Sequence, residues 1–251
     1  MPELHVISES FPDDPALDLA VSQALLERVA AGELPETLRL ARSGPMVAFA
    51  KRDAVAPAYG AAVRAAREAG FEPVLRMAGG RAAVFHEGTL VTAHAVPDPD
   101  PQSGIHERFR AEAGLVARAL RRLGLDARVG EVPGEYCPGR YSVNAGGERK
   151  LAGFGQRLVK GGSHTGAVVV CTGADRVRDV LLPVYEALEL DWDPATTGAV
   201  ADEDAGAGLE DVAEAIAAEY AESYELVEAE LDGETLELAR RRAPDHRPPR
   251  S

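Results

Sequence analysis

The sequence has little cysteine and no long apolar run. Its 251 residues contain two cysteines, Cys137 and Cys171. Thiols in such small number fit a reducing cytoplasm, although a single disulfide between the two stays an alternative. No apolar stretch approaches the length of a membrane-spanning helix, and the N-terminus lacks the basic-then-apolar pattern of a signal peptide. The sequence therefore predicts a cytoplasmic protein with no membrane partner.

Several familiar site motifs are also absent. There is no His-x-x-x-His or Cys-x-x-Cys pair, so we predict no metal site. The sequence has no phosphate-binding Gly-x-x-x-x-Gly-Lys loop and no Gly-x-Gly-x-x-Gly stretch of a dinucleotide-binding fold. It also lacks the Gly-x-Ser-x-Gly elbow that carries a nucleophilic serine. The chemistries that depend on these motifs are therefore not expected.

Basic residues are outnumbered in this chain. The 27 lysines and arginines face 41 aspartates and glutamates, a net charge of −14, which argues against a nucleic-acid partner. Residues 140–160 reverse this balance, with a single acidic residue among five basic ones: Arg140, Arg149, Lys150, Arg157 and Lys160. The local excess predicts an anionic ligand or an acidic partner, and the alternative is a solvated strand face.

The distribution of apolar residues predicts the fold class. Hydrophobic residues make up 45% of the chain, enough for a sizeable core. Apolar positions in residues 106–123 recur at steps of four and three, which predicts a helix with one apolar face. Residues 37–42 and 46–51 are strand-like and are joined by Ser43-Gly44-Pro45, which predicts a hairpin. Because strands come in hairpins as well as between helices, we predict an α+β fold, with helices packed on a mixed or antiparallel sheet.

The chain divides into three parts. Residues 1–190 carry most of the regular pattern and form the main domain, and residues 191–242 form a small C-terminal appendage of helix and strand. The tail, residues 243–251, contains three prolines and no apolar pattern, so we predict that it is disordered.

The first chemical candidate lies between residues 133 and 160. Cys137 stands in Tyr-Cys-Pro-Gly, a tight bend that keeps the sulfur out of the middle of a strand. Lys150 follows on a predicted strand, and a nearby ammonium favours the thiolate, so the two make a plausible nucleophile and electrostatic partner. The alternative is that Cys137 is a small buried hydrophobe. Cys171 ends the apolar run Ala-Val-Val-Val-Cys, and we interpret it as structural.

The second candidate is the stretch Arg76-Met-Ala-Gly79-Gly80-Arg81. Paired glycines let backbone N–H groups approach a carboxylate or phosphate closely, and the two arginines add charge-assisted contacts. The alternative is an ordinary turn between strands. His86 follows closely and is a candidate to line a pocket. His164, by contrast, lies in Gly-Ser-His-Thr, which we interpret as a turn.

Together the two stretches resemble the lipoate and octanoate branch of the biotin and lipoate protein ligase superfamily. Members typically carry Arg-x-x-Gly-Gly-x-Ala-Val, then a strand, a long helix and Lys-(Leu/Ile/Phe)-Ala-Gly-x-x-Gln-Arg. Here the first motif starts at Arg76, and the second runs Lys150-Leu-Ala-Gly153-Phe-Gly-Gln156-Arg157. The resemblance covers roughly residues 17–188. It implies a biotin/lipoate ligase catalytic-domain fold and makes residues 1–190 the catalytic acyl-transfer domain.

The resemblance also implies roles for single residues. Lys150 would contact the acyl carbonyl or an adenylate, and Gly79 and Gly80 would line the acyl tunnel. The Cys-Pro-Gly turn is similar to that of the cysteine-dependent octanoyltransferases, in which Cys137 would accept the acyl group as a thioester. The substrate-binding residues implied by the two motifs and their neighbourhood are Arg76, Gly79, Gly80, Arg81, His86, Gly153 and Gln156.

Three functions are weighed. The first is transfer of an octanoyl or lipoyl group onto the lysine of a lipoyl-carrier domain, without a cofactor. That domain would be a glycine-cleavage carrier or a 2-oxoacid dehydrogenase E2, with an acyl carrier protein as a further partner. The second is an ATP- and Mg-dependent lipoate–protein ligase; Arg81, where such ligases usually have a third glycine, and the short C-terminal part lean against it. The third is a non-catalytic acyl-binding module.

Overall fold

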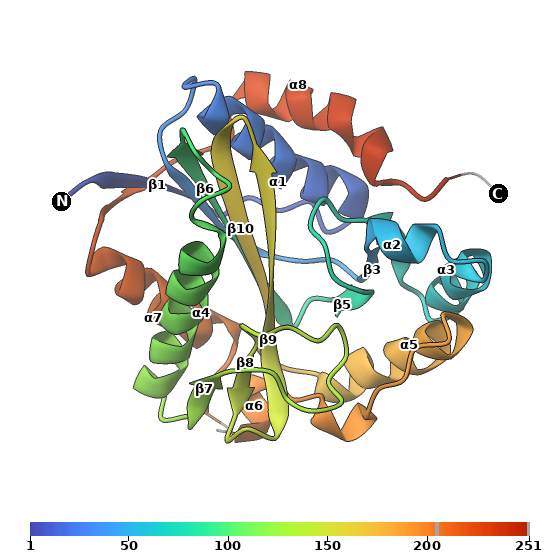
Figure 1. Ribbon diagram of the computed structural model, residues 1–251. Helices are drawn as coiled ribbons and strands as arrows, with labels where there is room; N and C mark the ends of the chain where they lie inside the picture. The colour runs from blue at the N-terminus through green and yellow to red at the C-terminus, as the bar shows by residue number, and fades with distance from the viewer. Residues whose placement is uncertain (204–205, 250–251) are drawn as a thin grey trace.

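A computed structural model describes residues 1–203 and 206–249 of the chain. Its elements divide between one large sheet, one small sheet and helices on both faces of the large one (Figure 1). The strands are β1 (Glu3–Ile7), β2 (Thr37–Arg42), β3 (Met46–Phe49), β4 (Glu72–Leu75), β5 (Ala83–Phe85), β6 (Thr89–Asp98), β7 (Ala127–Val129), β8 (Val143–Ala145), β9 (Arg149–Val159), β10 (Gly161–Val170) and β11 (Glu225–Glu228). The α-helices are α1 (Pro15–Ala30), α2 (Lys51–Ala54), α3 (Tyr59–Glu68), α4 (Ile105–Arg122), α5 (Ala174–Ala187), α6 (Val200–Glu203), α7 (Leu209–Ala221) and α8 (Gly233–Arg242), with short 3-10 helices η1 (Pro194–Thr196) and η2 (Ala243–His246).

The large sheet has eight strands in the order β11-β1-β2-β6-β10-β9-β8-β7. Strand β1 runs parallel to both of its neighbours, and the remaining pairs are antiparallel. The small sheet has the order β4-β3-β5, with one parallel and one antiparallel pair. The mixed sheets with packed helices confirm the predicted α+β class.

The two faces of the large sheet bury different cores, because side chains alternate along a strand. On β6, Leu90 packs in a cluster with Leu120 of α4 and Ile216 of α7. The next residue, Val91, belongs to a second cluster with the small sheet and with α3 and α5. Helix α1 packs against β6 and β10, and α8 lies along α1 on the outside (Figure 1).

Helix boundaries follow local signals closely. Helix α1 begins as the sequence suggests, with the Asp14 side chain accepting a hydrogen bond from the backbone N–H of Leu17 and with Pro15 in the first turn. The predicted helix over residues 106–123 is α4, displaced by one residue at each end. The apolar periodicity of this helix is visible in the local sequence, so it could be predicted without knowing what the helix packs against.

The predicted hairpin over residues 37–51 is wrong. Strand β2 pairs with β1 and β6 in the large sheet, whereas β3 pairs with β4 and β5 in the small one. The intervening Gly44 lies against the backbone of Pro12, where a Cβ atom would overlap it. The glycine therefore lets the link between β2 and β3 pass close to the backbone of the loop before α1, and it does not form a two-strand turn.

The C-terminal part packs onto the same body. Strand β11 extends the large sheet at β1, and α8 packs on α1, so the predicted helix and strand are present; the division at residue 190 stays a prediction. The structure contradicts the predicted disorder for residues 243–246, since these form η2, which buries Ala243 and His246. His246 Nδ1 lies 2.7 Å from the carbonyl oxygen of Leu75, and its Nε2 lies 2.8 Å from Oε1 of Gln23. Residues 250–251 lie outside the described part.

Candidate functional site

A cavity of about 530 Å³ lies between the large sheet, the loop after β4 and the turn that contains Cys137. Helices α1 and α4 and strands β5, β6, β9 and β10 supply its apolar wall, through Leu19, Phe85, Val91, Phe109, Leu158 and Val168. Arg76, Cys137 and Lys150 are polar exceptions in this wall. An apolar cavity of this size with a few convergent polar groups suits a small, largely apolar ligand.

Cys137 sits in the cavity wall with an unusual backbone. Its φ is +42°, a left-handed conformation that costs energy in a residue with a Cβ atom. The Cys137 N–H donates to the hydroxyl of Tyr185 on α5 at 2.8 Å, and that hydroxyl donates to the carbonyl of Ala82 at 2.9 Å. The surrounding contacts therefore hold the turn in place and keep the sulfur facing the cavity.

The thiol lies among positive groups. Its Sγ accepts from Nη2 of Arg76 at 3.3 Å and from the backbone N–H of Arg81 at 3.2 Å. Burial raises the pKa of Cys137, but the charges of Arg76 and Lys150 and the two hydrogen bonds outweigh it, so the pKa falls below its ordinary value. Cys137 is therefore biased toward the thiolate, the form that acts as a nucleophile.

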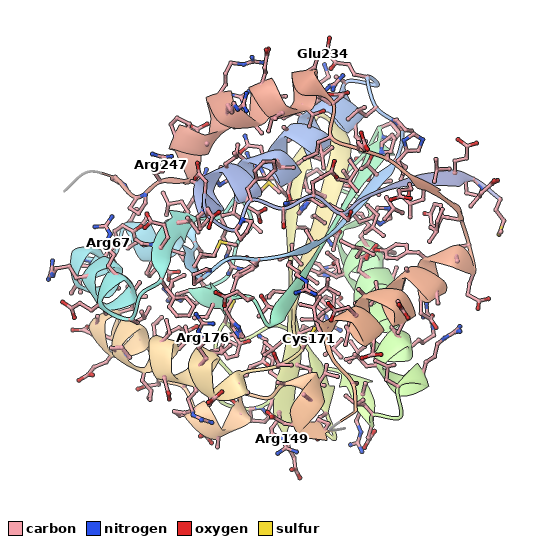
Figure 2. All side chains as sticks on the ribbon, turned by 180° about the vertical axis from the view of Figure 1, so that it is seen from behind. Arg67, Arg149, Cys171, Arg176, Glu234 and Arg247 are labelled. Carbon is pink, nitrogen blue, oxygen red and sulfur yellow. The ribbon has the colours of Figure 1, made fainter. Side chains whose placement is uncertain are left out.

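Cys171 provides the contrast. Both cysteines are free, so the disulfide considered from sequence is not formed. Cys171 lies inside the molecule, next to the strands of the large sheet (Figure 2), and burial raises the pKa of its thiol to about 12. Its Sγ lies 3.7 Å from the carbonyl oxygen of Val169, and no positive charge is among the causes that shift its pKa. These surroundings favour the neutral thiol.

Lys150 lies behind the Cys137 turn and is almost fully buried. Its Nζ donates to the carbonyl of Tyr136 at 3.0 Å, to the carbonyl of Cys137 at 2.8 Å and to Oε1 of Glu135 at 3.1 Å. An ammonium has three donors, and all three are thus engaged by the protein. For Lys150 to contact an acyl oxygen, as the resemblance implies, one of these bonds must be exchanged.

Sequence reasoning missed Glu135. Its buried carboxylate accepts from Lys150 Nζ, from the hydroxyl of Ser142 at 2.6 Å and from the N–H groups of Gly139 and Val132 at 2.9 and 3.1 Å. The only sequence signal was an acidic residue two positions before Cys137. Its pairing with a lysine fifteen residues later depends on the fold.

The Gly-Gly loop lies directly against the thiol. Gly79 and Gly80 both line the cavity, and Gly80 has a φ of +109°. A Cβ atom at Gly80 would lie 2.9 Å from Cys137 Sγ and would overlap the Arg76 guanidinium. Arg81 contributes its N–H to the sulfur, while its side chain turns away to pair with buried Asp53 at 3.0 Å.

Two predicted residues lie further along β9. Gly153 and Gln156 line the cavity, and a Cβ atom at Gly153 would lie 3.3 Å from Cε of Lys150. Gln156 donates from Nε2 to the carbonyl of Ile105 at 2.9 Å, which connects β9 to the start of α4. Lys150, Gly153 and Gln156 thus follow the cavity along one strand.

His86 was predicted to line a pocket and His164 to lie in a turn, but it is His164 that lines the cavity. His86 is buried, accepts the N–H of Gly88 on Nδ1 at 3.0 Å, and does not appear among the described residues that line the cavity. His164, predicted in a turn, lies within β10 and lines the cavity. Neither of its ring nitrogens has a hydrogen-bond partner within the described part of the chain, and burial lowers its pKa to about 4. The two glycines before His164 suggested a turn, whereas they let β10 pass close to Ala30 of α1.

Within residues 1–203 and 206–249, no group of three or more His, Cys, Asp or Glu side chains is arranged to hold a metal ion. In the same residues no helix combines the length and apolarity needed to cross a membrane.

The fold and the cavity define a catalytic domain of the biotin and lipoate ligase class. The chain belongs to the lipoyl protein ligase A/B catalytic domain family, whose model matches residues 14–190. It is 30% identical over 169 residues to an octanoyl-[GcvH]:protein N-octanoyltransferase of Geobacillus kaustophilus. The aligned part covers 67% of this chain and 59% of the relative. The chain spans less than two thirds of the length of the curated relatives it matches first.

Solved structures show the same fold. A lipoate-protein ligase A bound with ATP superposes with a TM-score of 0.79 at 22% identity, covering 96% of this chain and 94% of that one. A chain from Thermoplasma acidophilum, described as a bi-partite lipoate protein ligase and its E2 lipoyl domain, superposes with a TM-score of 0.75 at 20% identity, covering 97% and 93%. The family resemblance seen in the sequence is therefore confirmed.

Proposed function

We propose that this chain transfers an octanoyl or lipoyl group onto the lysine of a lipoyl-carrier domain through a thioester on Cys137. One observation carries the proposal: the Cys137 thiol faces an apolar cavity and accepts hydrogen bonds from the Arg76 guanidinium and the Arg81 N–H. The cavity offers room for an acyl chain, and the positive groups favour the thiolate that must attack its carbonyl.

The proposed transfer has two steps. The Cys137 thiolate attacks the acyl carbonyl, a carbon–sulfur bond forms, and the bond to the donor carrier breaks as the leaving atom of that carrier takes a proton from solvent. The lysine amine of the acceptor then attacks the thioester, an amide forms, the amine loses a proton and the Cys137 thiolate is released. Each step develops negative charge on the carbonyl oxygen, and the donors nearest to the sulfur, from Arg76 and Arg81, are placed to stabilise it. Lys150 adds its charge from behind the turn.

The partners follow from the same proposal. The Geobacillus relative is named for octanoyl-[GcvH], so an octanoyl-loaded glycine-cleavage carrier is the first donor to test, ahead of an acyl carrier protein. Acceptors are apo lipoyl domains of the same carrier or of a 2-oxoacid dehydrogenase E2. Arg149 already pairs with Glu203, while Arg140, Arg157 and Lys160 are exposed and suit an acidic carrier surface. The two free thiols support a cytoplasmic location.

The second candidate is an ATP-dependent lipoate–protein ligase. The chain shares its fold with a ligase structure bound with ATP, which is compatible with this candidate but does not select it. In this case Lys150 would contact a lipoyl-adenylate, Mg and ATP would be required, and Cys137 would be incidental. The positive groups around the Cys137 thiol, which lower its pKa, favour the thioester route, because a ligase has no need of a thiolate there.

Intact-mass analysis of acyl transfer to an apo lipoyl domain distinguishes the candidates. The wild-type protein, Cys137→Ala and the matched control Cys171→Ala are each given octanoyl-loaded carrier or, separately, free lipoate with ATP and Mg. We expect transfer from the carrier by the wild type and Cys171→Ala, an acyl adduct on the wild-type protein, and neither in Cys137→Ala. Modification that requires ATP and survives Cys137→Ala would establish the ligase instead. Acyl binding without turnover in either arm would indicate a binding module.

A further inference from the structure

Glu135 is a buried carboxylate that accepts four hydrogen bonds from the protein. Its side chain is fully buried, and its Oε1 accepts from Lys150 Nζ, Ser142 Oγ and the Gly139 N–H. Oε2 accepts from the N–H of Val132. These donors stand on both sides of Cys137 in the chain, so one carboxylate closes the loop that presents the nucleophile.

Lys150 connects the Glu135 carboxylate to the backbone of Cys137. Its ammonium bonds to Glu135 and also to the carbonyl oxygens of Tyr136 and Cys137. It also lies 4.8 Å from the centre of the Tyr136 ring. Cys137 has a strained positive φ, and such a conformation persists only where the surroundings over-determine it. Glu135 thus contacts Lys150, and Lys150 in turn contacts the backbone of Cys137.

We propose that Glu135 is a positioning residue, which holds the Lys150 ammonium under the Cys137 turn and thereby keeps the sulfur between Arg76 and the Arg81 N–H. The proposal rests on Cys137 being the nucleophile. Glu135 itself does not line the cavity and makes no hydrogen bond to the sulfur; it contacts Lys150, Gly139 and Ser142, which do line the cavity. Its effect is exerted through Lys150 and the turn.

The proposal predicts the direction in which the Cys137 thiol pKa changes when Glu135 is replaced. Arg76 and Lys150 face it with positive charge from the loop after β4 and from β9, and Tyr136 and Tyr185 face it from the turn and from α5. Glu135→Gln keeps the shape of the side chain and removes one negative charge. Coulomb's law alone would then lower the thiol pKa. If Glu135 holds Lys150 in place, the ammonium is released, its charge moves away and the thiol pKa rises.

The test is the rate of iodoacetamide alkylation of Cys137 from pH 5 to 10, followed by intact mass on the full chain, with Cys137→Ala as the blank. We expect Glu135→Gln to raise the apparent thiol pKa by about one unit, which is a tenfold loss of thiolate well below that pKa. The rate of octanoyl transfer should fall about tenfold, with KM for the carrier changed less than about threefold. A thiol pKa that falls or stays constant in folded Glu135→Gln would overturn the proposal.

Two further variants separate positioning from general damage. Glu219→Gln removes another buried glutamate, which pairs with Arg118 and Arg122 between α7 and α4, and should leave the thiol pKa unchanged. Lys150→Met should raise the thiol pKa by itself, and Glu135→Gln added to it should raise it no further, because the residue through which Glu135 acts is gone. The double variant removes both the carboxylate and the ammonium charge, so it remains informative even if Glu135→Gln alone does not fold. An additional rise in the double variant would contradict the proposal. Alkylation does not require acyl transfer, so a failure of the proposed function shows separately in the transfer assay.

Discussion

Gly80 is the residue at which the site is least tolerant of change. Its φ of +109° lies in a region that residues with a Cβ atom rarely adopt, at a cost of about 1–2 kcal/mol or more. In addition, the new methyl group would lie 2.9 Å from Cys137 Sγ and would displace the Arg76 guanidinium. We therefore expect Gly80→Ala to lower octanoyl transfer by at least about tenfold and to raise the thiol pKa, measured by transfer kinetics and alkylation.

The neighbouring glycine supplies the control for that prediction. A Cβ atom at Gly79 would meet no other atom within 4 Å, and its φ lies outside the left-handed region. Gly79→Ala should therefore cost much less activity than Gly80→Ala. Equal losses from the two variants would show that the loop is sensitive to any side chain, and that contact with Cys137 is not the cause.

The residues found from sequence are those whose signal is local. Cys137 was recognised by the turn around it, and Lys150 by a contiguous motif. Glu135 and His164 were missed because their importance depends on which strand or turn folds against them. His86 was chosen only because it follows the Gly-Gly loop closely, but Ala83 and Phe85 of β5 line the cavity and His86, directly after that strand, does not. Proximity in sequence was a poor guide where a strand intervened.

At the scale of elements, a buried ion pair joins α1 to β2. Arg39 and Asp18 are almost fully buried, 2.5 Å apart, and Arg39 also donates to the carbonyl of Glu9 and the hydroxyl of Ser22. Removing one partner leaves an uncompensated buried charge. We expect Asp18→Asn to lower the free energy of unfolding by about 3–5 kcal/mol, measured by urea denaturation.

An exposed pair of the same kind tests whether burial is the cause. Asp126 pairs with Arg128 at 2.5 Å on the surface, where solvent screens the interaction. Asp126→Asn should leave the urea midpoint within experimental error. A comparable loss in both variants would contradict the assignment of the α1–β2 effect to burial.

The elements were predicted well, whereas the predicted pairing of β2 with β3 was wrong. The extents of α4 and of the start of α1 follow from periodicity and capping, which act within a few residues. The partners of β2 and β3 are set by strands tens of residues away, and a Ser-Gly-Pro link is compatible with either a hairpin or a passage between sheets. Local turn chemistry fixes a direction change, and the burial of both strands decides which sheet each one joins.

At the scale of the whole molecule, η2 near the C-terminus contacts elements from the first third of the chain. The sequence predicted disorder for the tail, residues 243–251, because it contains three prolines and no apolar pattern. Residues 243–246 form η2 instead, and the two ring nitrogens of His246 contact Leu75 and Gln23, residues far away in the sequence. In Figure 2, Arg247 lies beside one end of α8 and Glu234 near the other, so the tail follows directly from that outer helix. No composition rule includes such contacts, because they exist only after α1 and β4 have been brought together.

His94 connects the large sheet to the helices on one of its faces, and it makes the stability of the whole molecule depend on pH. Its Nδ1 lies 2.8 Å from Glu112 of α4, and its Nε2 lies 2.8 Å from Glu36, just before β2. Burial alone would lower the pKa of His94, but the hydrogen bonds and charges of Glu112 and Glu36 raise it to about 9. Tyr220 of α7 donates to the same Glu112, so the imidazolium lies at the junction of the sheet, α4 and α7.

A histidine whose pKa is raised by folding stabilises the folded state while it is protonated. The stabilisation is complete below the unfolded-state pKa of about 6.5 and is lost as the pH rises through about 9. A shift of this size corresponds to something on the order of 3 kcal/mol between those limits. In urea denaturation from pH 6 to 10, the wild type should therefore lose its advantage over His94→Gln as the pH rises, most steeply between pH 7 and 9. A difference between the two proteins that stays constant across this range would show that His94 is neutral in the folded state, and that the two glutamates are held by other means.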